Sequence, residues 1–313
     1  MKKTLLAIAL ATASTTLYAA DAKVSFSGHV NYLFGDLEDF TGNEDTTVDG
    51  NGASGSRVRF VSSVKHGEIT YGARQEFSVG SGNGSNVGVR VNQFTLNGGF
   101  GQLSLGTGWE AGDDAAEQDL SGTYLLTGSG YDAWGLGFGK IDGSRDERLR
   151  YDSPKFGGVV KFAVDYDDSE DISVAVFAGG SNWKVAGYIE QRDDDDSDEA
   201  GVSASFNLGG FVLTGQLGER DETASGADDN RSYAGVILGY NKGKYSVAVD
   251  FANYEVNDGD TTDRDTAGLS FVYRPGKGVE LYAGLRSADD NVGTFVNGED
   301  SGEALLVGAR VKF

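Results

Sequence analysis

The last strand-like segment of the chain shows the side-chain pattern on which the fold prediction rests. Its apolar positions fall on every second residue: Leu305, Val307, Ala309, Val311 and Phe313. The positions between them are Leu306, Gly308, Arg310 and Lys312, of which the last two are positively charged. Because side chains alternate between the two faces of a strand, this segment predicts one apolar and one polar face. A strand of a membrane barrel needs both faces, but a strand of a soluble sandwich also has them.

The same alternation recurs along the chain and predicts strands. Clear examples cover residues 24–34, 69–79, 160–166, 245–251, 269–274 and 279–286. Arg, Glu and Asp occur within the polar faces of these segments and not only in the connections. No segment has the convincing periodicity of a helix. The sequence therefore predicts an all-β protein.

The connections decide between the barrel and the sandwich. Tight Gly-containing turns are expected at residues 66–67, 98–99, 156–158, 179–181, 209–210, 241–243 and 275–277. Longer acidic connections lie between them, such as residues 40–51, 193–199, 221–230 and 257–265. Short turns at one end and long loops at the other are typical of outer-membrane barrels. We predict a transmembrane antiparallel up-and-down β-barrel of about 16 strands, with short periplasmic turns, long external loops and an aqueous channel.

The beginning of the chain predicts export. Residues 1–20 have the features of a secretory signal peptide: a positive start at Lys2 and Lys3, an apolar stretch, and small residues before cleavage after Ala19 or Ala20. No later segment reaches the roughly 18 apolar residues that a transmembrane helix needs. We expect residues 21–313 to form a single barrel domain.

Composition narrows the possible functions. The chain has 313 residues, a formal net charge of −22 and no cysteine, so thiol chemistry and disulfides are excluded. Nucleic acid is not an expected partner, because phosphate binding needs a basic surface. The mean hydropathy of −0.32 would favour a soluble protein. It does not exclude a barrel, in which only every second strand residue meets lipid.

Other sites are weakly supported. The chain has only two histidines, His29 and His66, and no motif places a nucleophile or carboxylate beside His29. We therefore predict that the protein is not an enzyme, and we expect no cofactor. The acidic run that includes Asp193, Asp194, Asp195 and Asp196 could bind a divalent cation. A solvated external loop is the simpler interpretation.

The longest connection covers about residues 109–145 and is the candidate for function. It carries five acids near its start: Glu110, Asp113, Asp114, Glu117 and Asp119. Aromatic and aliphatic residues follow, including Tyr131, Trp134 and Phe138, and they need a surface to pack against. A connection folded into the barrel would bury these side chains on the wall and leave acids facing water. We expect Trp109 and Trp134 to help seat it, and Trp183 to belong to an interfacial girdle.

Several motifs resemble the general porins of Gram-negative bacteria. The run Arg-Tyr-Asp-Ser-Pro-Lys-Phe-Gly-Gly at residues 150–158 resembles the strand-turn-strand motif that follows their constriction loop. Residues 21–28 resemble their mature start, and residues 55–60 their second strand. Arg90, residues 96–106 and the terminal Phe313 match as well. One departure is Thr107, which stands where many members carry arginine.

The resemblance implies a trimeric barrel of 16 strands whose third external loop folds into the lumen. It further implies a constriction in which the five loop acids face a cluster of wall arginines. By position, the wall arginines are Arg57, Arg59, Arg74, Arg90, Arg148 and Arg150. Phe313 is the expected C-terminal assembly signal, read by the barrel-assembly machinery. Outer-membrane lipid, including lipopolysaccharide, is the expected surrounding.

These observations predict an outer-membrane diffusion porin that passes ions and small hydrophilic solutes passively. Two alternatives stay open: a substrate-selective channel for sugars or organic acids, and an adhesin or structural barrel. Few aromatic residues lie on the polar faces, which weakens the first alternative. We expect a preference for cations because acids gather in the mouth loops. The constriction arginines would instead favour anions.

Overall fold

The computed structural model describes residues 22–36, 47–49, 55–80, 87–127, 145–193, 197–222, 229–257, 261–290 and 301–313. The strands in this part of the chain are β1 (Lys23–Asp36), β2 (Thr47–Asp49), β3 (Ser56–His66), β4 (Ile69–Val79), β5 (Val87–Gly98), β6 (Gly101–Trp109), β7 (Arg145–Asp152), β8 (Val160–Asp167), β9 (Ile172–Gly179), β10 (Trp183–Arg192), β11 (Ser197–Leu208), β12 (Phe211–Glu222), β13 (Asp229–Lys242), β14 (Tyr245–Asn257), β15 (Thr261–Tyr273), β16 (Val279–Asp290) and β17 (Ser301–Lys312). Two short helices, α3 (Ala111–Ala116) and α4 (Tyr124–Thr127), lie in the long connection. None of the described helices is long and apolar enough to span a membrane. The predicted signal peptide lies outside the described residues.

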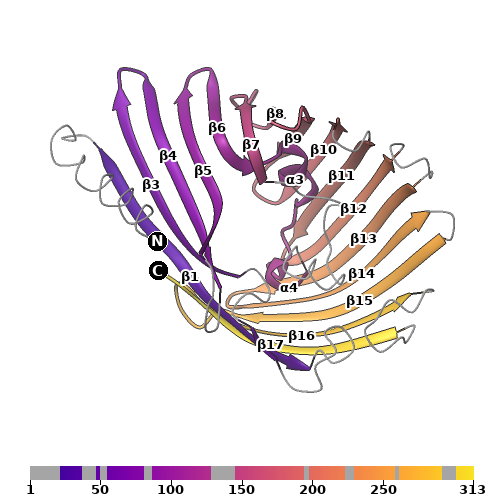
Figure 1. Cartoon of the computed structure of the whole chain (residues 1–313). Coiled ribbons are helices and arrows are strands. Elements are labelled where there is room, and N and C mark those ends of the chain that lie inside the picture. Colours follow the sequence, from indigo (N-terminus) through magenta and orange to yellow (C-terminus); the bar gives the residue numbers. More distant parts are fainter. Residues whose placement is uncertain are drawn as a thin grey trace.

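The strands form one closed antiparallel barrel (Figure 1). From β3 to β17, each strand pairs with its neighbour in sequence, and β17 pairs with β1 to close the ring. β2 pairs with residues 33–35 of β1, and β3 pairs with residues 23–29 of the same strand. They therefore share one strand position, and the described barrel has sixteen positions. The predicted barrel and its strand number are confirmed.

The alternation of side chains becomes a division between outside and inside. Large apolar side chains remain exposed around the ring, including Phe26 at 56%, Ile189 at 63% and Leu208 at 72%. In β17, Leu305 is 52% exposed whereas Leu306 is fully buried. A soluble sandwich would bury its apolar faces against each other. An apolar outer face on a closed ring is instead the surface that lipid covers.

Aromatic rings gather on the strand ends that lead to the short turns. Phe26 lies 5.6 Å from Phe313, Phe211 lies 4.7 Å from Tyr240, and Tyr245 lies 4.9 Å from Tyr273, measured between ring centroids. Such rings favour the boundary between hydrocarbon and headgroups. They mark one edge of the apolar band.

Candidate functional site

The long connection turns into the barrel immediately after β6. The backbone N–H of Ala111 donates to Asp165 Oδ2 of β8 at 2.6 Å, and that of Gly112 donates to Ser173 Oγ of β9 at 2.8 Å. Ser203 Oγ of β11 donates to the carbonyl of Ala115 at 2.5 Å. Small side chains allow this close approach, and α3 buries its alanines against Ala163, Ala175, Ala186 and Tyr188. Helix α3 therefore lies inside the barrel against the wall (Figure 1).

The chain then follows the inner wall across the following strands. Leu120 donates its N–H to Ser205 Oγ at 3.0 Å and accepts from Asn241 Nδ2 at 2.9 Å. Arg274 donates to the carbonyl of Gly122 at 2.5 Å, and Arg286 donates to that of Leu126 at 2.7 Å. These wall side chains pair with backbone groups of the segment that joins α3 to α4 and, at Leu126, of α4 itself. Residues 110–127 are thus fastened along the wall, and residues 128–144 lie outside the described part.

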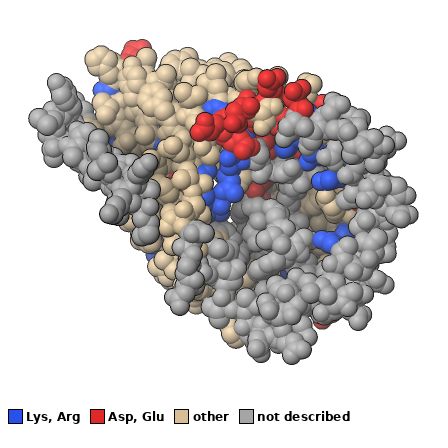
Figure 2. Space-filling view, in the orientation of Figure 1, with Lys and Arg blue, Asp and Glu red and all other residues tan. Residues whose placement is uncertain are grey.

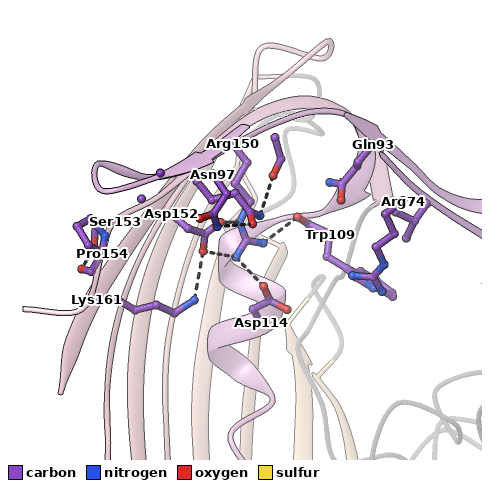
Figure 3. Close-up of a pocket in the computed structure, with 15 residues that line it drawn as sticks. Arg74, Gln93, Asn97, Trp109, Asp114, Arg150, Asp152, Ser153, Pro154 and Lys161 are labelled. Atoms are coloured by element: carbon purple, nitrogen blue, oxygen red, sulfur yellow. Dashed lines mark hydrogen bonds and ion pairs between the residues drawn. The ribbon is translucent and has the colours of Figure 1, made fainter. Parts of the chain in front are cut away.

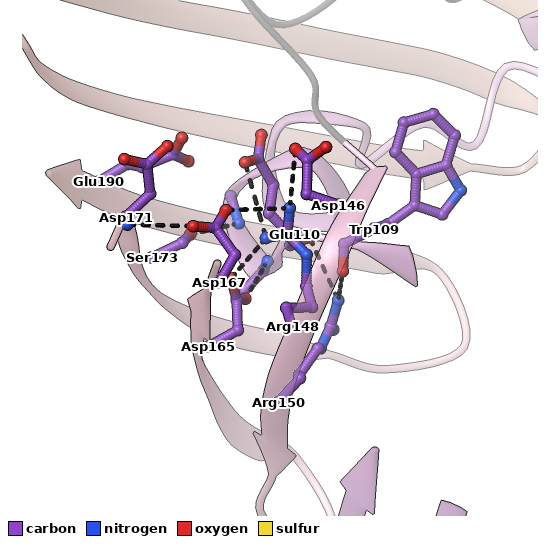
Figure 4. A network of polar contacts seen from close by, with 12 residues as sticks. Trp109, Glu110, Asp146, Arg148, Arg150, Asp165, Asp167, Asp171, Ser173 and Glu190 are labelled. Atoms are coloured by element: carbon purple, nitrogen blue, oxygen red, sulfur yellow. Dashed lines mark hydrogen bonds and ion pairs between the residues drawn. The ribbon is translucent and has the colours of Figure 1, made fainter. Parts of the chain in front are cut away.

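A buried ionic network holds the start of this connection (Figure 4). Arg148 lies 2.7 Å from Asp165, 3.5 Å from Asp167 and 3.9 Å from Glu110, measured between guanidinium nitrogens and carboxylate oxygens. Glu110 also lies 3.7 Å from Arg192. Arg148 and Glu110 are only 3% and 2% exposed. The structure therefore brings two predicted site residues together as an anchor between α3 and the wall.

Arg150 forms a second anchor, two residues further along β7. Its guanidinium lies 2.6 Å from Asp114 and 3.0 Å from Asp152, and it donates to the carbonyl of Trp109 at 3.0 Å. The Asp114 side chain stays 46% exposed, so this carboxylate faces water while its inner oxygen is paired. Sequence analysis predicted Arg150 and Asp114 but missed Asp152. The spacing of Arg150 and Asp152 on one polar strand face was the available signal.

Four arginines gather on the wall formed by β3, β4 and β5. Arg57, Arg59, Arg74 and Arg90 all pair with one carboxylate, that of Glu76, at distances of 3.7, 3.3 and 3.4 Å for Arg57, Arg74 and Arg90. Glu76 is 2% exposed. We call these five residues the arginine cluster. Four positive charges against one negative charge leave the cluster with a formal excess of three. All four arginines were predicted; Glu76 was not.

Trp109 and Arg145 join the arginine cluster to the loop. The guanidinium of Arg145 lies 4.4 Å from the centroid of the Trp109 ring, and that of Arg90 lies 5.8 Å from it, both as cation–π contacts. Asp113 is 7% exposed and interacts electrostatically with both arginines. Sequence analysis missed Arg145 because it was assigned to the end of the connection.

The remaining predicted residues have other places. Asp119 accepts hydrogen bonds from Thr214 at 3.0 Å and from the N–H of Ser121 at 2.7 Å, so it shapes the loop. Glu117 is partly buried. Asp193 directly follows β10, and its backbone N–H donates to the Asp171 carboxylate at 2.9 Å. Asp194, Asp195 and Asp196 lie outside the described residues, and the described ones include no acidic or histidine cluster suited to a metal ion.

A polar cavity of about 470 Å³ lies beside α3 on the side of the short turns (Figure 3). Its charged lining comes from Arg74, Asp114, Arg150, Asp152 and Lys161. Gln93, Asn97 and Gln102 add amide groups, and Trp109 adds an aromatic ring. The space-filling view shows basic side chains at a central opening of the molecule and a group of acidic side chains above them (Figure 2). The part of the lumen beside α3 is therefore polar and charged.

A closed antiparallel barrel with an apolar outer face and a charged lumen defines a channel of the outer-membrane type. The sequence matches the Gram-negative porin family over residues 4–293, and the chain belongs to this family. It is therefore an outer-membrane channel protein. No curated protein sequence matches it.

Solved porin structures have the same fold. An anion-selective porin from Comamonas acidovorans superposes with a TM-score of 0.76 at 19% identity, covering 94% of this chain and 100% of that one. OmpT of Vibrio cholerae in its trimer form gives a TM-score of 0.68 at 18% identity, covering 93% and 99%. Salmonella typhi OmpF, in complex with daunomycin, gives 0.67 at 11% identity, covering 93% and 97%.

Proposed function

We propose that the protein is a general diffusion porin through which ions and small hydrophilic solutes pass down their gradients. The observation that carries this proposal is the arginine cluster on β3 to β5, set in the same lumen as the wall-bound loop of residues 110–127. A sixteen-position barrel leaves an aqueous channel unless it is plugged. Charged groups around a narrow passage favour polar solutes, because apolar solutes must displace ordered water there.

We further propose that the channel prefers anions, against the expectation from net charge. Glu110 and Asp114 are paired with arginines of the wall, whereas four arginines share Glu76. Ions meet the strongest field where a low-dielectric passage is narrowest. The acids of the mouth loops act over a Debye length of only about 8 Å in physiological salt. The excess positive charge of the arginine cluster then decides the sign.

The first test is single-channel conductance of the refolded protein in a planar bilayer. Large, long-lived, ohmic steps that arrive in threes would support an open pore and a homotrimer, a trimer form being known for OmpT of Vibrio cholerae. A folded barrel that inserts and stays silent would reject free diffusion. That result would favour the adhesin or structural barrel.

The reversal potential in a salt gradient tests ion preference. At moderate ionic strength we expect a reversal potential with the sign of an anion-selective channel. The preference should weaken at high salt, because salt screens the field of the arginine cluster. A cationic sign would mean that the mouth acids control selectivity.

Removal of residues 111–130 tests the role of the loop. Because the described part of this segment occupies the inner wall, we expect a higher single-channel conductance and a larger solute size limit. Unchanged values in a folded variant would mean that the segment does not narrow the pore.

A further inference from the structure

Lysine is confined to one end of the described barrel. Every lysine in the described residues lies in a short turn or within a few residues of one or of a strand end on the same side: Lys23, Lys65, Lys155, Lys161, Lys184, Lys242, Lys244, Lys277 and Lys312. Arginines, in contrast, pair with carboxylates inside the lumen, as Arg148 does with Asp165. In bacterial outer-membrane barrels the short turns face the periplasm. The periplasmic end is therefore basic, although the whole chain is acidic.

The densest part of this end is formed by β13 to β17. We call it the basic rim, and it comprises Lys242, Lys244, Arg274, Lys277, Arg310 and Lys312. Backbone and side-chain contacts tie neighbouring turns together. Lys244 Nζ donates to the carbonyl of Pro275 at 2.7 Å, and the N–H of Lys312 donates to Gly278 at 2.7 Å. Lys242, Lys244 and Lys277 therefore lie on adjacent turns. Arg274, Arg310 and Lys312 pair with Glu280 on the lumen side of the same end.

Little negative charge opposes the basic rim. Glu280 is the carboxylate that pairs with it, at 3.3 Å from Arg274, 2.5 Å from Arg310 and 3.0 Å from Lys312. Lys242, Lys244 and Lys277 are exposed, and no carboxylate of the described residues pairs with them. These three lysines can accept an external anion without breaking an existing pair.

Aromatic rings fix the depth of these lysines. Tyr245 follows Lys244 directly and stacks on Tyr273 with its centroid 4.9 Å away. Tyr240 precedes Lys242 by two residues and packs on Phe211 of the outer face. Such rings lie at the boundary between hydrocarbon and headgroups. The lysines just beyond them lie at the level of lipid phosphates.

We propose that the basic rim binds anionic phospholipid of the periplasmic leaflet, with the phosphate held by Lys242, Lys244 and Lys277. Each lysine supplies a compact charge with three donors, which suits a phosphate diester. The adjacent tyrosines contact the glycerol and the start of the acyl chains. A soluble acidic polymer could use the lysines, but it would not use the aromatic girdle.

The test is native mass spectrometry of the detergent-solubilised protein with phosphatidylglycerol or phosphatidylcholine. We expect phosphatidylglycerol adducts that salt weakens and that phosphatidylcholine does not reproduce. The triple variant Lys242→Gln, Lys244→Gln, Lys277→Gln should bind phosphatidylglycerol at least about tenfold more weakly, because it removes three charges that attract anionic lipid. The single variant Lys277→Gln should show a smaller loss in the same direction.

The matched control removes three other lysines of the same end: Lys23→Gln, Lys65→Gln and Lys155→Gln. It has the same change in net charge and should keep the wild-type affinity. Equal loss in both triple variants, or equal binding of the two lipids, would overturn the proposal. Displacement of phosphatidylglycerol by soluble polyglutamate at equal charge concentration would assign the rim to a soluble acidic polymer instead.

Discussion

Glu76 is the residue on which the arginine cluster depends. It faces Arg59 directly across β3 and β4, and Arg74 lies two positions away on its own strand face. Four guanidinium groups on one wall would repel each other strongly in a partly desolvated site. One buried carboxylate lowers that repulsion and still leaves an excess of positive charge. Glu76 therefore sets both the geometry and the net charge of the cluster.

Glu76→Gln should strengthen the anion preference of the channel and lower the stability of the barrel. The amide keeps the shape but removes the charge that four arginines share, so the reversal potential should move further toward the anion limit. Loss of charge-assisted hydrogen bonds should lower the free energy of unfolding by roughly 1.5–3 kcal/mol. Glu68→Gln, in an exposed turn, is the control and should change neither value. A cationic shift in the Glu76 variant would contradict the assignment of the cluster to the selectivity of the pore.

For single residues, the sequence predicted which side chains belong to the site better than it predicted which of them pair with each other. The polar strand faces and the resemblance to porins indicated Arg57, Arg59, Arg74 and Arg90. They did not indicate Glu76 as the shared partner, because that choice depends on the register of β3 against β4. Register follows from the whole hydrophobic pattern and the turn between the strands, not from one residue.

Among the elements, α3 shows why the long connection stays on the wall. It has six residues, and its N-cap residue Glu110 makes no side-chain cap hydrogen bond. A helix of this length is not stable by itself in water. Contacts with Asp165, Ser173 and Ser203 supply the stability instead. These partners are 50 to 90 residues away along the chain, so the sequence indicated an inward loop but not its helix or its path.

Gly112→Val should push α3 from the wall toward the pore axis. A Cβ at this position would lie 2.9 Å from both Glu190 Oε2 and Tyr188 Cδ2, closer than packed side chains allow. The helix must shift, and single-channel conductance should fall. Gly99→Val is the control, because a Cβ there has open space around it. If both variants conduct like the wild type, the described loop does not limit the current.

For the whole molecule, closure of the ring depends on β1 and β17, the first and last strands of the described chain. Phe313 exchanges backbone hydrogen bonds with Gly28 at 2.9 and 3.0 Å, and its ring lies 5.6 Å from that of Phe26. Strand number and the two faces were predictable because they repeat in every hairpin. Closure joins residues almost 300 positions apart and costs the most chain entropy, so its contacts should form late.

Phe313→Ala should therefore slow barrel closure more than it weakens the finished barrel. Loss of the ring contact should lower the free energy of unfolding by only about 1 kcal/mol, the usual contribution of an aromatic pair. The rate of refolding should fall by a larger factor. It can be followed by gel electrophoresis, because a closed barrel migrates differently from the same protein after heating. Phe251→Ala is the control: Phe251 is 53% exposed, close to the 54% of Phe313, but lies within β14, away from the seam. Equal slowing in both variants would mean that Phe313 acts only as one more lipid-facing side chain, and that closure is not the step that limits folding.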